Sequence, residues 1–103
     1  MRALKFTVKA QKLKKDVSCD FSGLVKGSKG YLQAEFSFSE DYAGCGKIAV
    51  FRNQGEEFPM RLENDSCIIP EEALTWRTFQ VCVVGVREGY RIRTNYVEVR
   101  QDD

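Results

Sequence analysis

The chain has 103 residues, of which 43% are hydrophobic and 30% are charged, and its formal net charge is +1 at pH 7. This length fits one domain, which we expect to span residues 1–103, and the composition excludes a disordered chain. No uninterrupted apolar run is longer than Val81–Val84. Since a bilayer-spanning helix needs ~20 apolar residues, the sequence predicts no membrane partner.

Alternation of apolar and polar residues predicts a series of short strands along the whole chain. In chain order, we expect them at residues 4–9, 17–21, 31–39, 47–52, 57–63, 66–69, 76–84 and 90–100. Polar, glycine-containing or Asn-Asp segments at 53–55, 64–65 and 87–89 separate neighbouring strands and are typical of hairpin turns.

Two local features interrupt this strand pattern. Pro70, followed by Glu71 and Glu72, is typical of the start of a helical turn, which we expect at 70–74 as a crossover between two sheets. In the last strand the apolar residues change from even to odd positions beyond Asn95. A bulge there would explain the change, because one extra residue turns the residues that follow to the other face of the sheet.

Seven to eight short strands with regular turn signals predict an all-β fold, an antiparallel two-sheet β-sandwich with one short helical turn. An immunoglobulin-like arrangement and another Greek-key arrangement both fit the order of elements. A small closed barrel is the competing architecture.

The four cysteines, Cys19, Cys45, Cys67 and Cys82, share no Cys-x-x-Cys spacing, and the chain has no histidine. We therefore expect no metal and no cofactor. The N-terminal residues alternate like a strand and do not form the apolar core of a signal peptide. We accordingly expect synthesis in a cytoplasm and free thiols, with two disulfides as the alternative.

Charge is unevenly distributed, because residues 1–30 hold eight of the 16 basic residues but only two acidic ones, Asp16 and Asp20. This asymmetry is compatible with packing against copies of the same chain or against an acidic surface, and also with an ordinary solvated face. The basic cluster at 12–15 is short and lacks interleaved aromatic residues, so we expect no nucleic-acid partner.

Three sets of residues are candidates for interaction. Asp41, Tyr42 and Lys47 follow one another along a glycine-containing loop and are possible recognition residues, although an Asx-type turn with a buried ring explains the same pattern. Trp76 opens a strand, which favours a core anchor over a sugar-stacking platform.

The third set, Arg87, Arg91 and Arg93, is a possible basic stripe. Arg91 and Arg93 share strand parity and therefore one face of the sheet. Such a stripe fits an acidic partner, and a solvated strand face is the simpler explanation.

The sequence does not predict an enzyme. Neighbouring glutamates such as Glu71 and Glu72 point to opposite faces if they lie on a strand, so they do not form a catalytic carboxylate pair. Cys45, in a glycine-rich loop, is the only plausible reactive thiol, but no base accompanies it and its glycine neighbours alone do not lower a thiol pKa.

An ordered series of short motifs covers the chain from about residue 4 to residue 99. The motifs are Phe36-x-Phe38-Ser39-x-Asp41-Tyr42, Lys47-x-Ala49-x-Phe51, Ile69-Pro70-x-Glu72-x-Leu74, Val84-Gly85-Val86 and Ile92-x-Thr94-Asn95. This series resembles small β-sandwich modules of phages and prophages of Gram-positive bacteria. The aromatic residue after Asp41 is usually tryptophan in that pattern and is tyrosine here.

The resemblance implies a non-enzymatic virion structural protein: a capsid decoration or head-fibre protein, or a baseplate adaptor. It implies localisation in the virion, synthesis in the bacterial host cytoplasm, and a phage capsid or tail protein as partner, with homo-oligomers such as trimers among the options. Two alternatives are a module that binds host cell wall or another carbohydrate and a small phage effector that binds a host protein.

Overall fold

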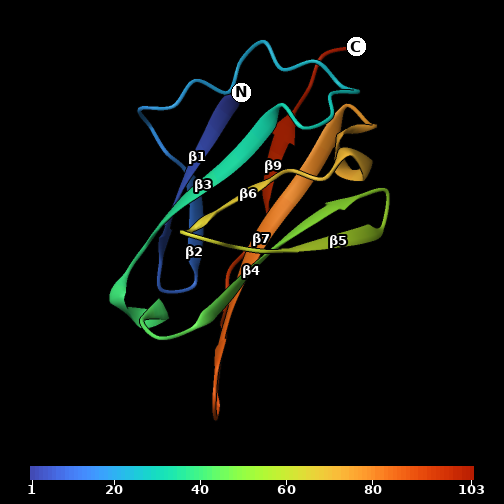
Figure 1. Cartoon of the computed structure of the whole chain (residues 1–103). Helices are drawn as coiled ribbons and strands as arrows, with labels where there is room; N and C mark the ends of the chain where they lie inside the picture. Colours follow the sequence, from blue (N-terminus) through green and yellow to red (C-terminus); the bar gives the residue numbers. More distant parts are fainter.

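The computed structural model describes all residues, 1–103, and consists of two β-sheets packed face to face (Figure 1). The two-sheet β-sandwich expected from the sequence is therefore confirmed. Both termini lie at one end of the molecule, and the hairpin between the seventh and eighth strands projects from the other end.

The four-stranded sheet has the spatial order β2 (Lys12–Lys15), β1 (Arg2–Lys9), β3 (Leu32–Phe38) and β6 (Ser66–Ile68). The five-stranded sheet begins with β5 (Glu56–Arg61), β4 (Gly46–Asn53) and β7 (Thr78–Arg87). Its remaining strands, β8 (Tyr90–Arg93) and β9 (Val97–Arg100), both pair with β7 along the edge opposite β4.

The core lies between the two sheets because every second residue of each strand points inward. The four-stranded sheet contributes Leu4, Phe6, Val8, Leu32, Ala34 and Phe36, and the five-stranded sheet contributes Ala49, Phe51, Phe79, Val81, Val83 and Val99. The rings of Phe6 and Phe36 stack with their centroids 5.2 Å apart. This alternation is the pattern from which the strands were predicted.

Three details differ from the expectation. There are nine strands, and β1 pairs with β3 in parallel, so the four-stranded sheet is mixed. This parallel pair arises because the long segment 16–31 returns the chain to the starting end of β1 before β3 begins. There are also two short 3-10 turns, η1 (Glu40–Tyr42) and η2 (Glu71–Leu74). The second of these is the predicted helical turn, and it connects the two sheets.

The strand expected at residues 17–21 is absent, and the second strand is instead β2, formed by the basic cluster. Two Asx turns account for the difference. Asp16 Oδ1 accepts hydrogen bonds from Ser18 N (2.8 Å) and Oγ (2.6 Å), and Asp20 Oδ1 accepts the same pair from Ser22. Such local bonds compete with strand pairing, and they hold the pKa of both carboxyls below the usual range.

The bulge expected near Asn95 is confirmed. Val84 pairs with Arg93 and Val81 pairs with Val97, so residues 94–96 lie opposite only residues 82 and 83 of β7. The Asn95 side chain then accepts a hydrogen bond from Leu13 N at 2.8 Å and donates one to Leu13 O at 3.2 Å. The bulge therefore ties the five-stranded sheet to β2.

Candidate interaction face

One of the three residues of the predicted loop patch is buried. The Tyr42 side chain is fully buried, and its hydroxyl donates a hydrogen bond to the Ala10 carbonyl at 2.7 Å. Burial raises the pKa of Tyr42 to about 12. Asp41 accepts a hydrogen bond from Ser39 Oγ at 2.7 Å, which joins two side chains, so the buried ring of the alternative explanation is confirmed but the Asx-type turn is not.

Lys47 shares one neighbour with Tyr42, the ring of Phe38. Its ammonium group pairs with Asp65 Oδ1 at 2.8 Å and lies 4.7 Å from the centroid of the Phe38 ring. These contacts fix Lys47 between the β5–β6 turn and the sandwich. Tyr42 is therefore wrong as a recognition residue, because its side chain is buried, whereas a role for Asp41 and Lys47 stays a prediction.

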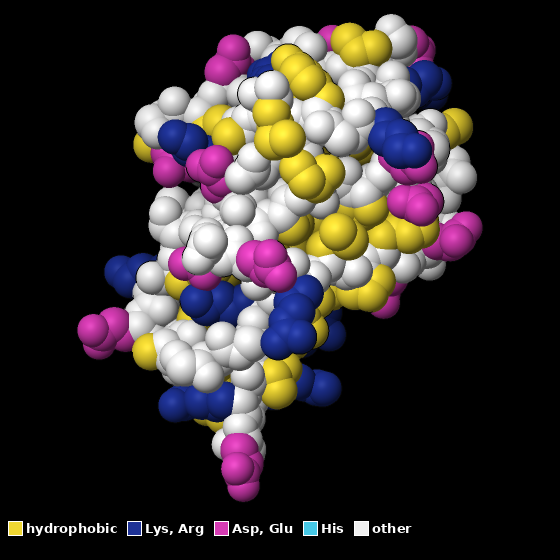
Figure 2. All heavy atoms as spheres, in the orientation of Figure 1, with side chains coloured by type: hydrophobic (Ala, Val, Ile, Leu, Met, Phe, Trp, Pro, Cys, Tyr) yellow, Lys and Arg dark blue, Asp and Glu magenta, His cyan; other side chains and the backbone are white.

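The shared sheet face predicted for Arg91 and Arg93 is confirmed, and Arg87 lies off that face. Arg91 and Arg93 pair with Val86 and Val84 of β7, and their exposed side chains share the outer face of the five-stranded sheet. Arg87 has the opposite parity, and its guanidinium lies 4.1 Å from the centroid of the Tyr90 ring at the tip of the hairpin. Figure 2 shows Lys and Arg side chains around this projecting hairpin.

The outer face of the five-stranded sheet, called the interaction face below, is ordered into rows by the strand register. One row reads Arg61, Ile48, Val84, Arg93 across β5, β4, β7 and β8. The next reads Pro59, Val50, Cys82. The next reads Glu57, Arg52, Gln80, Glu98.

An apolar band runs through the middle of the interaction face. It contains Ile48, Val50, Val84 and Val86, and Val86 is 41% exposed. Beside it, Gly46 has no side chain, and a shallow hollow of about 260 Å³ opens between Pro59, Arg61 and Val86. The solvent side of a sandwich sheet normally alternates polar residues with the inward apolar ones, so a band of aliphatic side chains there indicates a contact surface.

Arg61, Arg91 and Arg93 stand around this band, and the structure's three ion pairs involve none of them. The acidic residues of the face lie further along the strands, in a polar network. Tyr96 donates its hydroxyl to Glu57 Oε2 at 3.0 Å, and the Arg52 guanidinium stacks 3.7 Å from the centroid of the Tyr96 ring. Burial, Cys82 and Glu57 raise the pKa of Tyr96 to about 12.

Sequence reasoning missed most of this face. Arg61 belongs to it only because β5 pairs with β4 in the observed register, which the sequence does not specify. A signal did exist in β7, where apolar residues occupy both parities from Val81 to Val86. A strand that is apolar on both sides predicts that both sides are covered.

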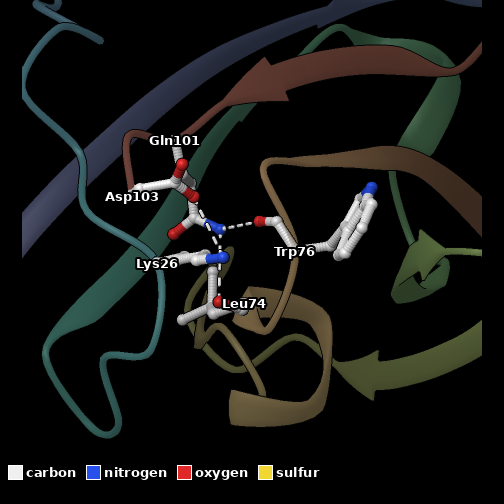
Figure 3. Close-up of polar contacts among 5 residues, drawn as sticks. All are labelled: Lys26, Leu74, Trp76, Gln101 and Asp103. Carbon is white, nitrogen blue, oxygen red and sulfur yellow. Dashed lines mark hydrogen bonds and ion pairs between the residues drawn. The ribbon is translucent and has the colours of Figure 1, made fainter.

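Trp76 is not a core anchor, which corrects the expectation from the sequence. Its side chain is 42% exposed because Leu74 and Phe79, on either side of the bend, fill the core positions. Figure 3 shows the ring pointing away from Gln101, whose Nε2 donates to the Trp76 carbonyl at 2.8 Å. The backbone is thus fixed while the ring lies at the surface.

We expect the fluorescence of Trp76, the single tryptophan, to be that of an exposed indole with emission at long wavelength. Lys26 Nζ and Arg77 Cζ each lie 5.9 Å from its ring centroid. Because Lys26 is paired with Asp103 at 3.0 Å, a neutral quencher is the suitable probe, and acrylamide should quench the emission strongly. Blue-shifted emission that acrylamide does not quench would contradict the placement of this ring.

No group of three or more Cys, Asp or Glu side chains is arranged to hold a metal ion. The four cysteines are unpaired. Burial raises the pKa of the Cys67 thiol to about 12 and also raises the pKa of Cys82, so neither is a ready nucleophile at neutral pH. The chain contains no helix long and apolar enough to cross a bilayer.

Comparison with known proteins adds no assignment: no protein-family model, curated protein sequence or solved structure matches the chain. The candidate site therefore stands on its own residues, an outer sheet face with an apolar band and with arginines that make no ion pair.

Proposed function

We propose that this chain is a non-enzymatic structural protein of a phage particle, a capsid decoration or head-fibre protein or a baseplate adaptor, that acts through protein–protein contacts. The observation that supports binding is the apolar band of the interaction face. The assignment to a phage particle rests on the sequence resemblance alone.

A protein partner suits this face better than nucleic acid or a small molecule. Aliphatic side chains held in water are covered favourably by another apolar surface, and arginines at the rim are common in protein interfaces. Nucleic-acid affinity comes mainly from phosphate contacts with basic residues, which would leave the apolar band of this face uncovered. The hollow beside Gly46 is shallow and lacks convergent polar groups, so it does not suit a small ligand.

A second candidate function, binding of host cell wall or another carbohydrate, is favoured by the exposure of Trp76. An exposed indole is a suitable platform for a sugar ring. The two cations beside it, Lys26 and Arg77, would favour an anionic polymer.

The test is co-sedimentation of the purified protein with phage particles assembled without it and, in parallel, with host cell walls. We expect saturable binding to particles, about tenfold weaker for Val86→Asp because a carboxylate would enter the apolar band. Val17→Asp is the matched control, since Val17 is fully exposed on another part of the surface. Binding to walls alone, reduced by Trp76→Ala, would replace this proposal with the second candidate.

A further inference from the structure

The half of the interaction face next to the β7–β8 hairpin, called the open half below, carries arginines and no carboxylate. Its residues form three rows across the strands, which are Gly46, Val86 and Arg91; Arg61, Ile48, Val84 and Arg93; and Pro59, Val50 and Cys82. None of them is acidic, and the three arginines make no ion pair. Cations around aliphatic side chains are complementary to a partner with aliphatic side chains and negative charge.

The side chain of Tyr96 separates the open half from the acidic residues of the same face. Its hydroxyl reaches across the sheet to Glu57 Oε2 at 3.0 Å, and its ring stacks on Arg52. Glu98 lies in the same row as Glu57 and accepts a hydrogen bond from Gln80 Nε2 at 3.4 Å. Both carboxylates are thus engaged on the far side of Tyr96, and the arginines of the open half are left for a partner.

The open half has the dimensions of a short α-helix. Arg61 and Arg93 stand in one row with β4 and β7 between them, so three strand spacings, about 14 Å, separate their backbones. An α-helix with its side chains is about 10–12 Å across. Along β4, Gly46 and Val50 are about 13 Å apart, the length of about nine helical residues. The hollow beside Gly46 gives room for an aliphatic side chain of such a helix.

We propose that the partner of the interaction face binds through an acidic amphipathic helix that lies along β4 and β7. Its aliphatic stripe covers Ile48, Val84 and Val86, and its carboxylates lie beside Arg61 and Arg91. This inference rests on the proposed function, since it names the chemistry of the protein that covers the same face. Burial of the stripe supplies affinity, and the flanking charge pairs fix the orientation of the helix.

This chain does not itself supply such a helix. Its two helical segments, η1 and η2, are 3-10 turns of three and four residues, and both contain buried side chains. A second copy of the chain is therefore not the partner that fits the open half.

The experiment titrates the isotope-labelled chain with two synthetic helical peptides of about 20 residues and follows the backbone amides by NMR. Both peptides carry the same leucine stripe, flanked by glutamates in the first and by lysines in the second. We expect the glutamate peptide to bind with saturation and to shift the amides of Ile48, Val84 and Val86. The lysine peptide should bind at least about tenfold more weakly, because it places like charges in contact. Polyglutamate of the same length, which has the charge without the stripe, should also bind at least about tenfold more weakly.

Charge reversal tests the arginines directly. Arg61→Glu and Arg91→Glu should each weaken binding of the glutamate peptide about tenfold, and the double variant should prefer the lysine peptide. A reversed preference requires a folded chain with an intact apolar band, so loss of structure does not imitate it. Arg100→Glu is the matched control, since Arg100 pairs with Thr78 on the same sheet face but beyond the Tyr96 ring. It should leave binding unchanged within about twofold.

No binding of the glutamate peptide, or equal binding of the two peptides, would overturn the inference. So would an Arg100→Glu variant that is weakened as much as Arg61→Glu, because net charge alone would then explain binding. Amide shifts of the open half that depend on protein concentration without peptide would show that a second copy covers it, and would also overturn the inference.

These measurements use no particles. A chain that binds the glutamate peptide but does not co-sediment with particles would contradict only the proposed function. A chain that co-sediments with particles but does not distinguish the peptides would contradict only this inference.

Discussion

Replacing Gly85 by alanine should destabilise the protein by about 3 kcal/mol, although the change adds a single methyl group. Gly85 points into the core from β7, against the ring of Tyr42. A Cβ atom there would lie 2.7 Å from Tyr42 Cδ2 and 3.2 Å from Ile92 Cγ2. The ring has little freedom to move, because its hydroxyl is bonded to Ala10 and its other side lies against Phe38, with the ring centroids 4.9 Å apart.

Urea unfolding of the purified variant measures this effect, and Gly46→Ala is the matched control. A Cβ atom at Gly46 would meet only the Val86 carbonyl oxygen, at 3.8 Å. The control should be unchanged or up to about 1 kcal/mol more stable, since alanine restricts the unfolded chain. Combining Gly85→Ala with Tyr42→Ala should cost less than the sum of the two single changes. Equal stability of the two glycine variants would contradict the packing described for Tyr42.

The strands were predictable wherever one face of the chain is buried. Leu4, Phe6 and Val8 alternate with polar residues, and the observed β1 has that facing. The predicted strand was wrong where side chains accept hydrogen bonds from nearby backbone, as at Asp16 and Asp20, because such turns leave no trace in the alternation of apolar residues.

Pairing between distant strands was not predictable. The parallel arrangement of β1 and β3 depends on the path of residues 16–31, whose composition does not specify a direction. The interaction face likewise depends on register, which brings Arg61 beside Ile48 across two strands. Residues on one strand could be assigned to a common face, as Arg91 and Arg93 were, because parity along a single strand is a local property.

Trp76 illustrates why residue type alone does not determine burial. The position of Trp76 at the start of a strand suggested a core anchor. At the bend after η2, however, Leu74 and Phe79 are the residues whose side chains point into the core. At a bend, the backbone conformation determines whether a large aromatic side chain points into the core or toward solvent. Its backbone direction here is set by the distant Gln101.

A polar residue, Asn53, occupies the inward-facing position at the end of β4, and its replacement by leucine should cost about 2 kcal/mol. Its Nδ2 donates to the carbonyls of Glu72 and Ala73, both at 2.9 Å. Those carbonyls belong to η2, which is too short to satisfy them within its own turn. Leucine would leave the Ala73 carbonyl without a donor at a position that is 7% exposed, whereas the Glu72 carbonyl would keep its hydrogen bond from Thr75 Oγ1 at 3.2 Å. Urea unfolding measures the cost, with Gln33→Leu as a control on the outer side of β3.

Asn53→Asp adds a test that depends on pH. A carboxylate would face the same two carbonyls, so the pKa of Asp at this position should rise above its unfolded value of about 3.9. Below the unfolded pKa the carboxyl is protonated in both states, so its ionisation does not lower the unfolding free energy. As pH rises from the unfolded pKa toward the raised folded pKa, only the unfolded state loses its proton, and the unfolding free energy falls. The difference in unfolding free energy between this variant and the wild type should therefore be small near pH 3 and large at pH 7. A difference that does not change with pH would show that Asn53 does not hold η2 through these two carbonyls.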